Sequence, residues 1–258
     1  MAHASEWGRY YWPDGKPAYE VPSADGKKMV EPDIRHAKKL NLKPSVTTII
    51  QEAAKPGLER WKREQVLMAA LTLPRLDGEI ESAWIKRVFE DSEEQARKAA
   101  ENGTAIHAAV QTIYGGGVVD ASVARFACPA IDTIDGKYGS QLWESEKSFA
   151  TDDFGGKTDL TKVLGEGHHG YVIDLKTKEF GEDHKKLAWD EHCIQLAAYR
   201  NGLSLPKAKC ANVFVSVNNP GLVVIHEWNE KELERGWKMF VALKDYWYAR
   251  TGLARPGA

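Results

Sequence analysis

The sequence has few cysteines and no long apolar run. Its three cysteines, Cys128, Cys193 and Cys210, lie far apart without a C-x-x-C pair. Neither a structural zinc site nor a disulfide framework is therefore indicated, and we expect buried thiols. No apolar stretch approaches the roughly 20 residues that a membrane span requires, and the N-terminal MAHASEWGRYYW lacks the charged-then-apolar layout of a secretory signal. We therefore expect a cytoplasmic protein with no membrane partner.

The sequence also lacks an excess of charge of either sign. Lysine and arginine total 35, aspartate and glutamate total 37, and the net charge is −2. This balance excludes a general electrostatic coat for nucleic acid, so local patches must hold any anionic partner. The 258 residues, 43% of them hydrophobic, are enough to bury one substantial core. We expect a single domain over residues 1–258.

Local patterns in the first part of the chain predict an arm followed by helices. Residues 1–44 are rich in turn signals such as WPDGKP, which predict hairpins or an extended arm. Capping residues and helical periodicity predict a helical segment over 45–115. Its expected features are a helix entrance capped by Ser45 or Thr47, a helix over 56–71, and a helix over 92–114 that starts at a capping box on Ser92.

Residues 116–228 show the alternation that is typical of strands, and residues 229–258 read as a long final helix. Helices first and strands later indicate an α/β fold, in which a central mixed β-sheet is flanked by helices and preceded by an N-terminal helical segment. The expected elements are strands over 141–150, 156–164, 170–177, 211–217 and 222–228, with a helix over 185–201 between the third and fourth strands.

The stretch GGKTD at 155–159 contains the Gly-Lys-Thr end of a phosphate-binding loop. Such a loop needs Gly-x-x-x-x-Gly-Lys-Ser/Thr between a strand and a helix. Thr151 stands where the first glycine would be, and the residues after Thr158 are typical of a strand that enters a hairpin. The pattern therefore does not indicate a nucleotide-binding loop, and Asp159 becomes the residue of interest.

Two acidic residues are predicted to lie inside adjacent strands. Asp174 and Lys176 share one face of a strand by period-2 alternation, and Asp159 lies across the hairpin. Two carboxylates this close in an apolar strand pair repel each other unless a cation holds them together. Mg²⁺ or Mn²⁺ suits two such oxygen ligands and keeps positions for water and a substrate phosphate. Salt bridges of Asp159 with Lys157 and of Asp174 with Lys176 are the alternative, but such pairs normally lie in water.

Four motifs in one order add to this interpretation. They are Gly-x-x-x-His ending at His107, Gly-x-x-Asp ending at Asp159, Asp-Leu-Lys-Thr at 174–177 and Gln-x-x-x-Tyr ending at Tyr199. In order and spacing the chain resembles the PD-(D/E)XK nuclease superfamily, in particular its RecB-like branch with the Cas4-like, phage and mitochondrial exonucleases. The resemblance covers about residues 100–200, with a lesser match at PSVTT, and it implies a restriction-endonuclease-like core.

The resemblance also implies a metal centre that would bind Mg²⁺ or Mn²⁺. His107, Asp159 and Asp174 would supply ligand side chains, and Leu175 would supply a backbone carbonyl. Asp159, Asp174 and Lys176 would be the catalytic residues. Iron–sulfur members of the family use four cysteines at positions that the three cysteines of this chain do not match, so we expect no iron–sulfur cluster.

Five further residues are implied in supporting or DNA-binding roles. Gln195 and Tyr199, one helical turn apart, would support the active site and the DNA backbone beside it. Thr177 would add a hydroxyl beside the catalytic lysine. Many relatives carry glutamate where this chain has Gln111, and the missing negative charge leaves a second metal position open. Glu146, on the preceding strand, would supply an acidic contact.

The implied function is that of a metal-dependent deoxyribonuclease that acts on a single- or double-stranded DNA end in recombination, repair or phage DNA metabolism. Exonuclease action is favoured because the helical segment 57–114 could form a wall that admits a DNA end, and endonuclease action stays open. A rival is a nucleic-acid-binding or scaffold protein that kept the fold but lost turnover. The presence of Asp159, Asp174 and Lys176 speaks against that rival, and Gln111 speaks for it. The implied compartment is the cytoplasm of a bacterium or of a phage-infected host cell, and the oligomeric state stays open.

Overall fold

The computed structural model describes residues 9–54, 56–165 and 169–255. The chain forms two compact units, one from residues 1–53 and 106–258 and the other from residues 54–105. Each unit has its own secondary structure and is described by itself. A single domain over the whole chain stays a prediction.

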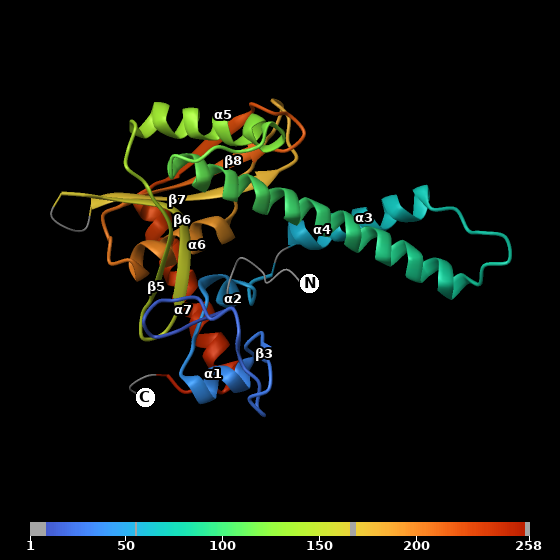
Figure 1. Cartoon of the computed structure of the whole chain (residues 1–258), viewed down its shortest axis with the longest axis horizontal. Helices are drawn as coiled ribbons and strands as arrows, with labels where there is room; N and C mark the ends of the chain where they lie inside the picture. The colour runs from blue at the N-terminus through green and yellow to red at the C-terminus, as the bar shows by residue number, and fades with distance from the viewer. Residues whose placement is uncertain (1–8, 55, 166–168, 256–258) are drawn as a thin grey trace. The chain divides into compact units, whose positions relative to one another are not determined.

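The larger unit is built on one five-stranded sheet (Figure 1). The strands lie side by side in chain order, and only β7 and β8 run parallel to each other. The sheet is therefore mixed, as the sequence predicts. The five strands are β5 (Glu144–Ala150), β6 (Gly155–Leu164), β7 (His169–Lys178), β8 (Lys209–Ser216) and β9 (Val223–Trp228).

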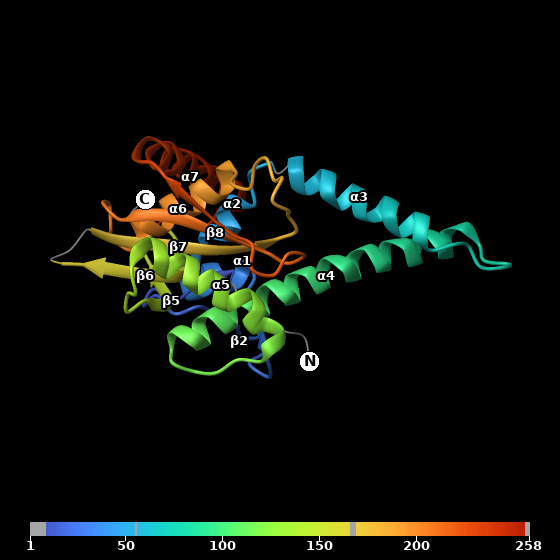
Figure 2. The ribbon, with the colours of Figure 1, turned by 90° about the horizontal axis from the view of Figure 1, so that it is seen from above.

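Helices cover both faces of this sheet (Figure 2). Helices α6 (Asp190–Gly202) and α7 (Glu230–Thr251) pack on the face that carries Val172, and α5 (Ala121–Tyr138) packs on the face that carries Ile173. Neighbouring residues of β7 point to opposite faces because the side-chain period of a strand is two. Both faces are apolar, so the expected α/β fold with a flanked central sheet is confirmed.

The N-terminal residues form short paired strands, as the turn signals predict. Strand β1 (Tyr10–Tyr11) pairs with β4 (Lys43–Pro44), and β2 (Val21–Pro22) pairs with β3 (Met29–Val30). The helices of this region are α1 (Ile34–Leu40) and α2 (Val46–Ile50). Ser45 caps α2 by accepting a hydrogen bond from the Thr48 N–H, which confirms the predicted helix entrance.

The smaller unit consists of α3 (Pro56–Thr72) and the first part of α4 (Glu81–Tyr114). The prediction for α3 is confirmed to within one residue. The predicted start of α4 at Ser92 is wrong, because the helix begins eleven residues earlier, at Glu81. Ser92 lies inside the helix, and its hydroxyl donates to the Phe89 carbonyl instead of capping a helix end.

Three further expectations need correction. Helix α5 was not among the predicted helices; the Asp120 carboxylate caps it by accepting from the Ser122 N–H, and Pro129 lies inside it. Helix α6 starts at Asp190 rather than at residue 185. Cys193 and Cys210 are buried, but Cys128 is exposed.

None of the described helices combines the length and the apolar character that a membrane span requires.

Candidate active site

The two predicted acidic residues, Asp159 and Asp174, lie just beyond the end of the β6–β7 ladder. The last paired residues on this side are Leu160 and Ile173. Beyond them, the Asp159 carboxylate takes the place of a backbone partner, because its Oδ2 accepts the Leu175 N–H at 2.6 Å. Asp159 is 6% exposed and Asp174 is 0% exposed. The structure therefore brings two buried carboxylates onto neighbouring strands.

Asp174 is held by donors from two strands. The Lys176 ammonium lies 2.8 Å from its Oδ1 and 2.6 Å from its Oδ2. The Asn212 amide on β8 donates to Oδ2 at 2.7 Å, and the Trp228 indole on β9 donates to the Asn212 carbonyl oxygen at 2.7 Å. Burial raises the pKa of Asp174 more than the Lys176 charge lowers it. Sequence reasoning missed Asn212 and Trp228.

Asp159 faces a histidine from α4. His107 Nδ1 lies 3.4 Å from Asp159 Oδ1. Burial alone would lower the pKa of His107, but the Asp159 carboxylate outweighs burial and raises it. Burial likewise acts to raise the pKa of Asp159, yet the His107 and Lys176 charges and the Leu175 N–H lower it. The two carboxyl groups thus have pKa values that are moved in opposite directions, an arrangement that separates their chemical roles.

A small cavity adjoins this pair of residues. Its volume is about 10 Å³, close to the minimum that one water molecule requires. Glu146 reaches it from β5 with a backbone φ of 54°, in the left-handed region that a non-glycine residue rarely adopts. The Glu146 carboxylate forms an ion pair with Lys157. The lining residues are His107, Val110, Gln111, Glu146, Asp159, Leu160 and Leu175.

The donor chemistry of the site fits a hard divalent cation. Asp159 Oδ1 is buried, and its contact among the described residues is the ion pair with His107 Nδ1 at 3.4 Å. The Leu175 N–H points toward β6, where it meets the Asp159 carboxylate, and the C=O of the same residue points to the same side because the backbone of a strand is extended. Carboxylate and carbonyl oxygens suit Mg²⁺ or Mn²⁺, whereas the His107 imidazole is a ligand typical of transition metals. Within the described ranges, no three His, Cys, Asp or Glu side chains lie close enough together to hold an ion. The Asp174 carboxylate is instead paired with the Lys176 ammonium.

Helix α6 places two predicted supporting residues beside each other. The Gln195 amide donates to the Tyr199 hydroxyl at 2.9 Å, and burial raises the pKa of Tyr199 well above its usual value. Tyr199 packs edge-on against Phe149, with ring centroids 6.0 Å apart. Thr177 lies on the opposite face of β7 from Lys176, because the two residues are adjacent in the strand.

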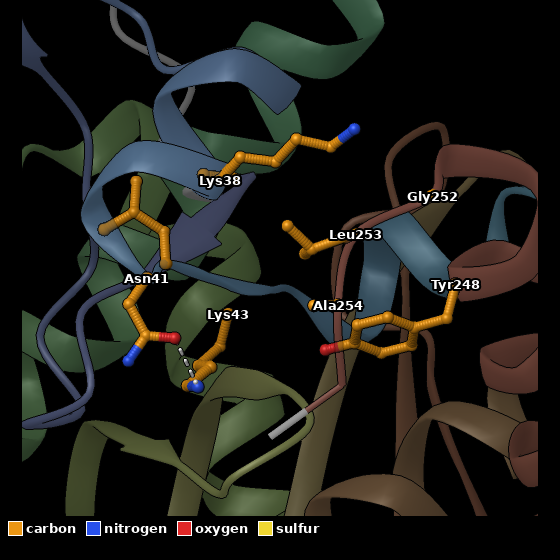
Figure 3. A pocket seen from close by; sticks show the side chains of 9 residues that line it. Lys38, Asn41, Lys43, Tyr248, Gly252, Leu253 and Ala254 are labelled. Carbon is orange, nitrogen blue, oxygen red and sulfur yellow. Dashed lines mark hydrogen bonds between the residues drawn. The ribbon is translucent and has the colours of Figure 1, made fainter. Parts of the chain in front are cut away.

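A larger cavity of about 230 Å³ lies elsewhere in the same unit (Figure 3). Lys38, Asn41 and Lys43 line one side, and Tyr248 and residues 252–254 line the other. The Lys43 ammonium donates to the Asn41 side-chain oxygen at 3.1 Å. The lining contains no carboxylate, imidazole or thiol among the described residues. This cavity therefore lacks the ligands that the carboxylate site offers to a divalent cation.

Comparisons with known proteins give distant structural likenesses. No family model matches the chain, and no curated protein matches it. One similar solved structure is that of SSO0001, at 14% identity, a TM-score of 0.32, and coverage of 79% of this chain and 76% of that chain. Another is an Eubacterium rectale protein described as a "putative exonuclease", at 14% identity, a TM-score of 0.40, and coverage of 60% of this chain and 70% of that chain. At these TM-scores the likenesses do not identify a function.

Proposed function

We propose that the chain is a divalent-metal-dependent deoxyribonuclease with exonuclease action. The observation that carries the proposal is the buried group of Asp159, Asp174, Lys176 and His107, in which two carboxylates lie on neighbouring strands and His107 Nδ1 lies 3.4 Å from Asp159 Oδ1. Two buried carboxylates on neighbouring strands are costly unless positive charge and ligands compensate them. The motifs that resemble the PD-(D/E)XK nucleases contain these same four residues.

Each residue has a role in this proposal. His107, Asp159, Asp174 and the Leu175 carbonyl would hold Mg²⁺ or Mn²⁺. The ion, when bound, polarises a phosphoryl oxygen and makes a bound water more acidic. Lys176, whose side chain is 25% exposed, presents its ammonium both to Asp174 and to solvent. There it would neutralise charge on the scissile phosphate or orient the attacking water.

The substrate class proposed is DNA with a free end. The ammonium of Lys176 and the metal site together match a phosphodiester, and the resemblance to RecB-like exonucleases favours cleavage from an end. Gln195 and Tyr199 would support the carboxylate site from α6. A role in recombination, repair or phage DNA metabolism belongs to the same proposal.

A second candidate is a DNA-binding protein of the same fold that has lost turnover. Gln111 lines the small cavity at the position where many relatives carry glutamate. The loss of one acidic group there weakens the case for a second metal ion. An endonuclease is the third outcome that the experiment below must separate.

The test is a cleavage assay on linear and circular DNA with Mg²⁺, with Mn²⁺ or with EDTA. The proposal expects degradation of linear DNA only, abolished by EDTA, by Asp174→Asn and by Lys176→Met. Lys207→Met is the matched control: Lys207 is exposed, lies between α6 and β8 and is not a residue of the candidate site, so activity should stay unchanged. Cleavage of circular DNA would show an endonuclease. Retention of DNA without cleavage under any metal would support the binding protein.

A further inference from the structure

A chain of hydrogen bonds crosses three strands and ends on Asp174. The Trp228 indole N–H donates to Asn212 Oδ1 at 2.7 Å, and Asn212 Nδ2 donates to Asp174 Oδ2 at 2.7 Å. Asp174 and Asn212 are 0% exposed, and Trp228 is 7% exposed. They lie on β7, β8 and β9, and Asp174 and Asn212 are direct partners in the parallel ladder. These three side chains and the hydrogen bonds between them are therefore shielded from water.

The chemistry of the indole fixes the direction of this chain. An indole nitrogen can only donate, so the Asn212 atom that faces Trp228 must be the amide oxygen. The amide NH₂ is therefore turned toward Asp174, where a buried carboxylate needs a donor. The His226 ring packs edge-on against Trp228 with centroids 4.3 Å apart, which holds the indole in place. A free Asn212 side chain could rotate, but this one has a single satisfied orientation.

Asn212 also makes the two oxygens of Asp174 unequal. Oδ2 accepts the Asn212 hydrogen bond and lies in an ion pair with Lys176, whereas Oδ1 accepts, among the described residues, the Lys176 hydrogen bond and no amide. We infer that Asn212, oriented by Trp228, is a positioning residue that fixes the Asp174 carboxylate so that Oδ1 is the oxygen that receives a divalent ion. The inference rests on the proposed metal-dependent function, because it concerns the same carboxylate.

A purely structural role would not require this polar chain. Three polar groups on apolar strands cost desolvation energy, and well-packed apolar residues of the same shape can be equally stable. Of the other residues on this face of β8, Cys210 and Phe214 belong to the apolar core, and Ser216, at the end of the strand, donates to the Phe180 carbonyl. When a residue that hydrogen-bonds to a ligand carboxylate and orients it is removed, metal affinity typically falls by about 10- to 100-fold.

The test measures Mn²⁺ binding to the full chain by calorimetry, independently of DNA cleavage. Trp228→Phe keeps an aromatic ring and removes the indole N–H, and Asn212→Leu removes the amide. Each should weaken Mn²⁺ binding by about tenfold or more. Trp143→Phe is the matched control, because the Trp143 indole nitrogen is also buried but donates to no described residue. It should leave the affinity unchanged.

Two further readouts separate positioning from stability. In the double variant, Trp228→Phe should add nothing to the loss caused by Asn212→Leu, because Trp228 acts through Asn212. The ¹⁵N–¹H signal of the Trp228 indole, identified among the nine tryptophans by its absence in Trp228→Phe, should shift when Mg²⁺ is added to the wild-type protein. The same signal should not respond to Mg²⁺ in Asn212→Leu.

The outcomes distinguish this inference from the proposed function. Wild-type Mn²⁺ affinity in Trp228→Phe, or an indole signal that ignores bound Mg²⁺, would overturn the positioning role and leave the nuclease proposal standing. Mn²⁺ binding that depends on Trp228 in a protein that cleaves no DNA would support the positioning role while the nuclease proposal fails. A wild-type protein that binds neither ion would overturn both.

Discussion

Gly156 shows how little room one residue leaves beside the candidate site. A Cβ atom at this position would lie 2.8 Å from both Phe149 Cζ and Tyr199 Cε1. Both rings are buried, so neither can move away cheaply. Gly156, the second glycine of the stretch GGKTD, is therefore explained by close packing of Tyr199 and Phe149 against the sheet, a reason unrelated to phosphate binding.

We predict that Gly156→Ala destabilises the protein by about 1–3 kcal/mol, because the added methyl group overpacks the core. The measurement is urea-induced unfolding. Gly136→Ala is the control: Gly136 lies in α5, and a Cβ there would meet nothing within 4 Å. It should stabilise the helix by up to about 1 kcal/mol. Equal effects of the two substitutions would contradict the packing explanation.

Arg200 forms a bidentate ion pair with Glu230. Its two terminal nitrogens donate to the Glu230 carboxylate at 2.8 and 2.9 Å, and its side chain is 6% exposed, whereas that of Glu230 is 61% exposed. The hydrogen bonds from Arg200 lower the pKa of Glu230. A carboxylate with a lowered pKa stabilises the fold above its unfolded pKa of about 4.5, and that contribution is lost as the pH falls through the folded pKa.

Glu230→Gln should therefore cost about 1–2 kcal/mol at pH 7, a value kept low by the solvent around Glu230. The difference from wild type should stay constant above about pH 5 and shrink as the pH falls below 4.5. Unfolding curves over this pH range measure both effects. Glu234→Gln, one turn further along α7 and exposed, removes a charge that acts on Arg200 but no hydrogen bond, so it should cost less than Glu230→Gln. A difference that grows toward acid pH would refute the assignment.

The residues of the candidate site differ in how visible they are in the sequence. Asp159, Asp174 and Lys176 can be predicted because charges inside apolar, alternating segments stand out. Asn212 and Trp228 cannot, because the partners of Asn212 lie 38 and 16 residues away and only the strand register joins them. The lone asparagine in ANVFVSV was the available signal.

At the scale of elements, a single capping residue can determine the stability of a helix end. Asn229 begins α7 with a capping box, in which its side chain accepts the Glu232 N–H at 3.0 Å and the Glu232 carboxylate accepts the Asn229 N–H at 2.9 Å. Asn229→Ala should cost about 1 kcal/mol, and Asn229→Asp should restore most of it. Thermal unfolding of the three proteins measures this. Failure of the aspartate to recover stability would mean that the cap is not what the alanine removes.

Element boundaries also show where local patterns mislead. Ser92 followed by two glutamates and a glutamine has the composition of a helix start, yet the helix runs through it, because a serine hydroxyl can bond to a carbonyl of its own helix. Helix α5 escaped prediction although Asp120 was available as its cap, since Pro129 is a residue that normally ends a helix. Strand positions were predicted to within a few residues, because alternation is a short-range signal.

At the scale of the whole molecule, the mixed sheet could be predicted but the division into two units could not. The order of helices and strands indicates which layers form. The division depends on how many long-range contacts each segment makes, which local periodicity does not report. Residues 54–105 read as ordinary amphipathic helices in the sequence, yet Leu67, Leu71 and Phe89 among them are exposed.

The smaller unit should open at a lower free energy than the larger one. Its described helical residues include few buried ones, Ala69, Val88, Ser92 and Gly103, whereas nine consecutive residues of α6, from 192 to 200, are buried. Hydrogen exchange protection follows buried apolar contacts and can range from near zero to the global stability. Amides of α3 should therefore exchange with an opening free energy lower than that of α6 by several kcal/mol, on the order of 3 or more.

Two variants test whether the units open separately. Val88→Ala should speed exchange in α3 and in the first part of α4 while α6 keeps its protection. Val213→Ala, which removes the same two methyl groups from the sheet core, should speed exchange in the strands and α6. Exchange followed by mass spectrometry of peptides resolves these regions. If Val88→Ala instead lowered protection evenly in both units, the two units would unfold together. A destabilising substitution in one unit lowers the protection of another only when both take part in the same cooperative transition.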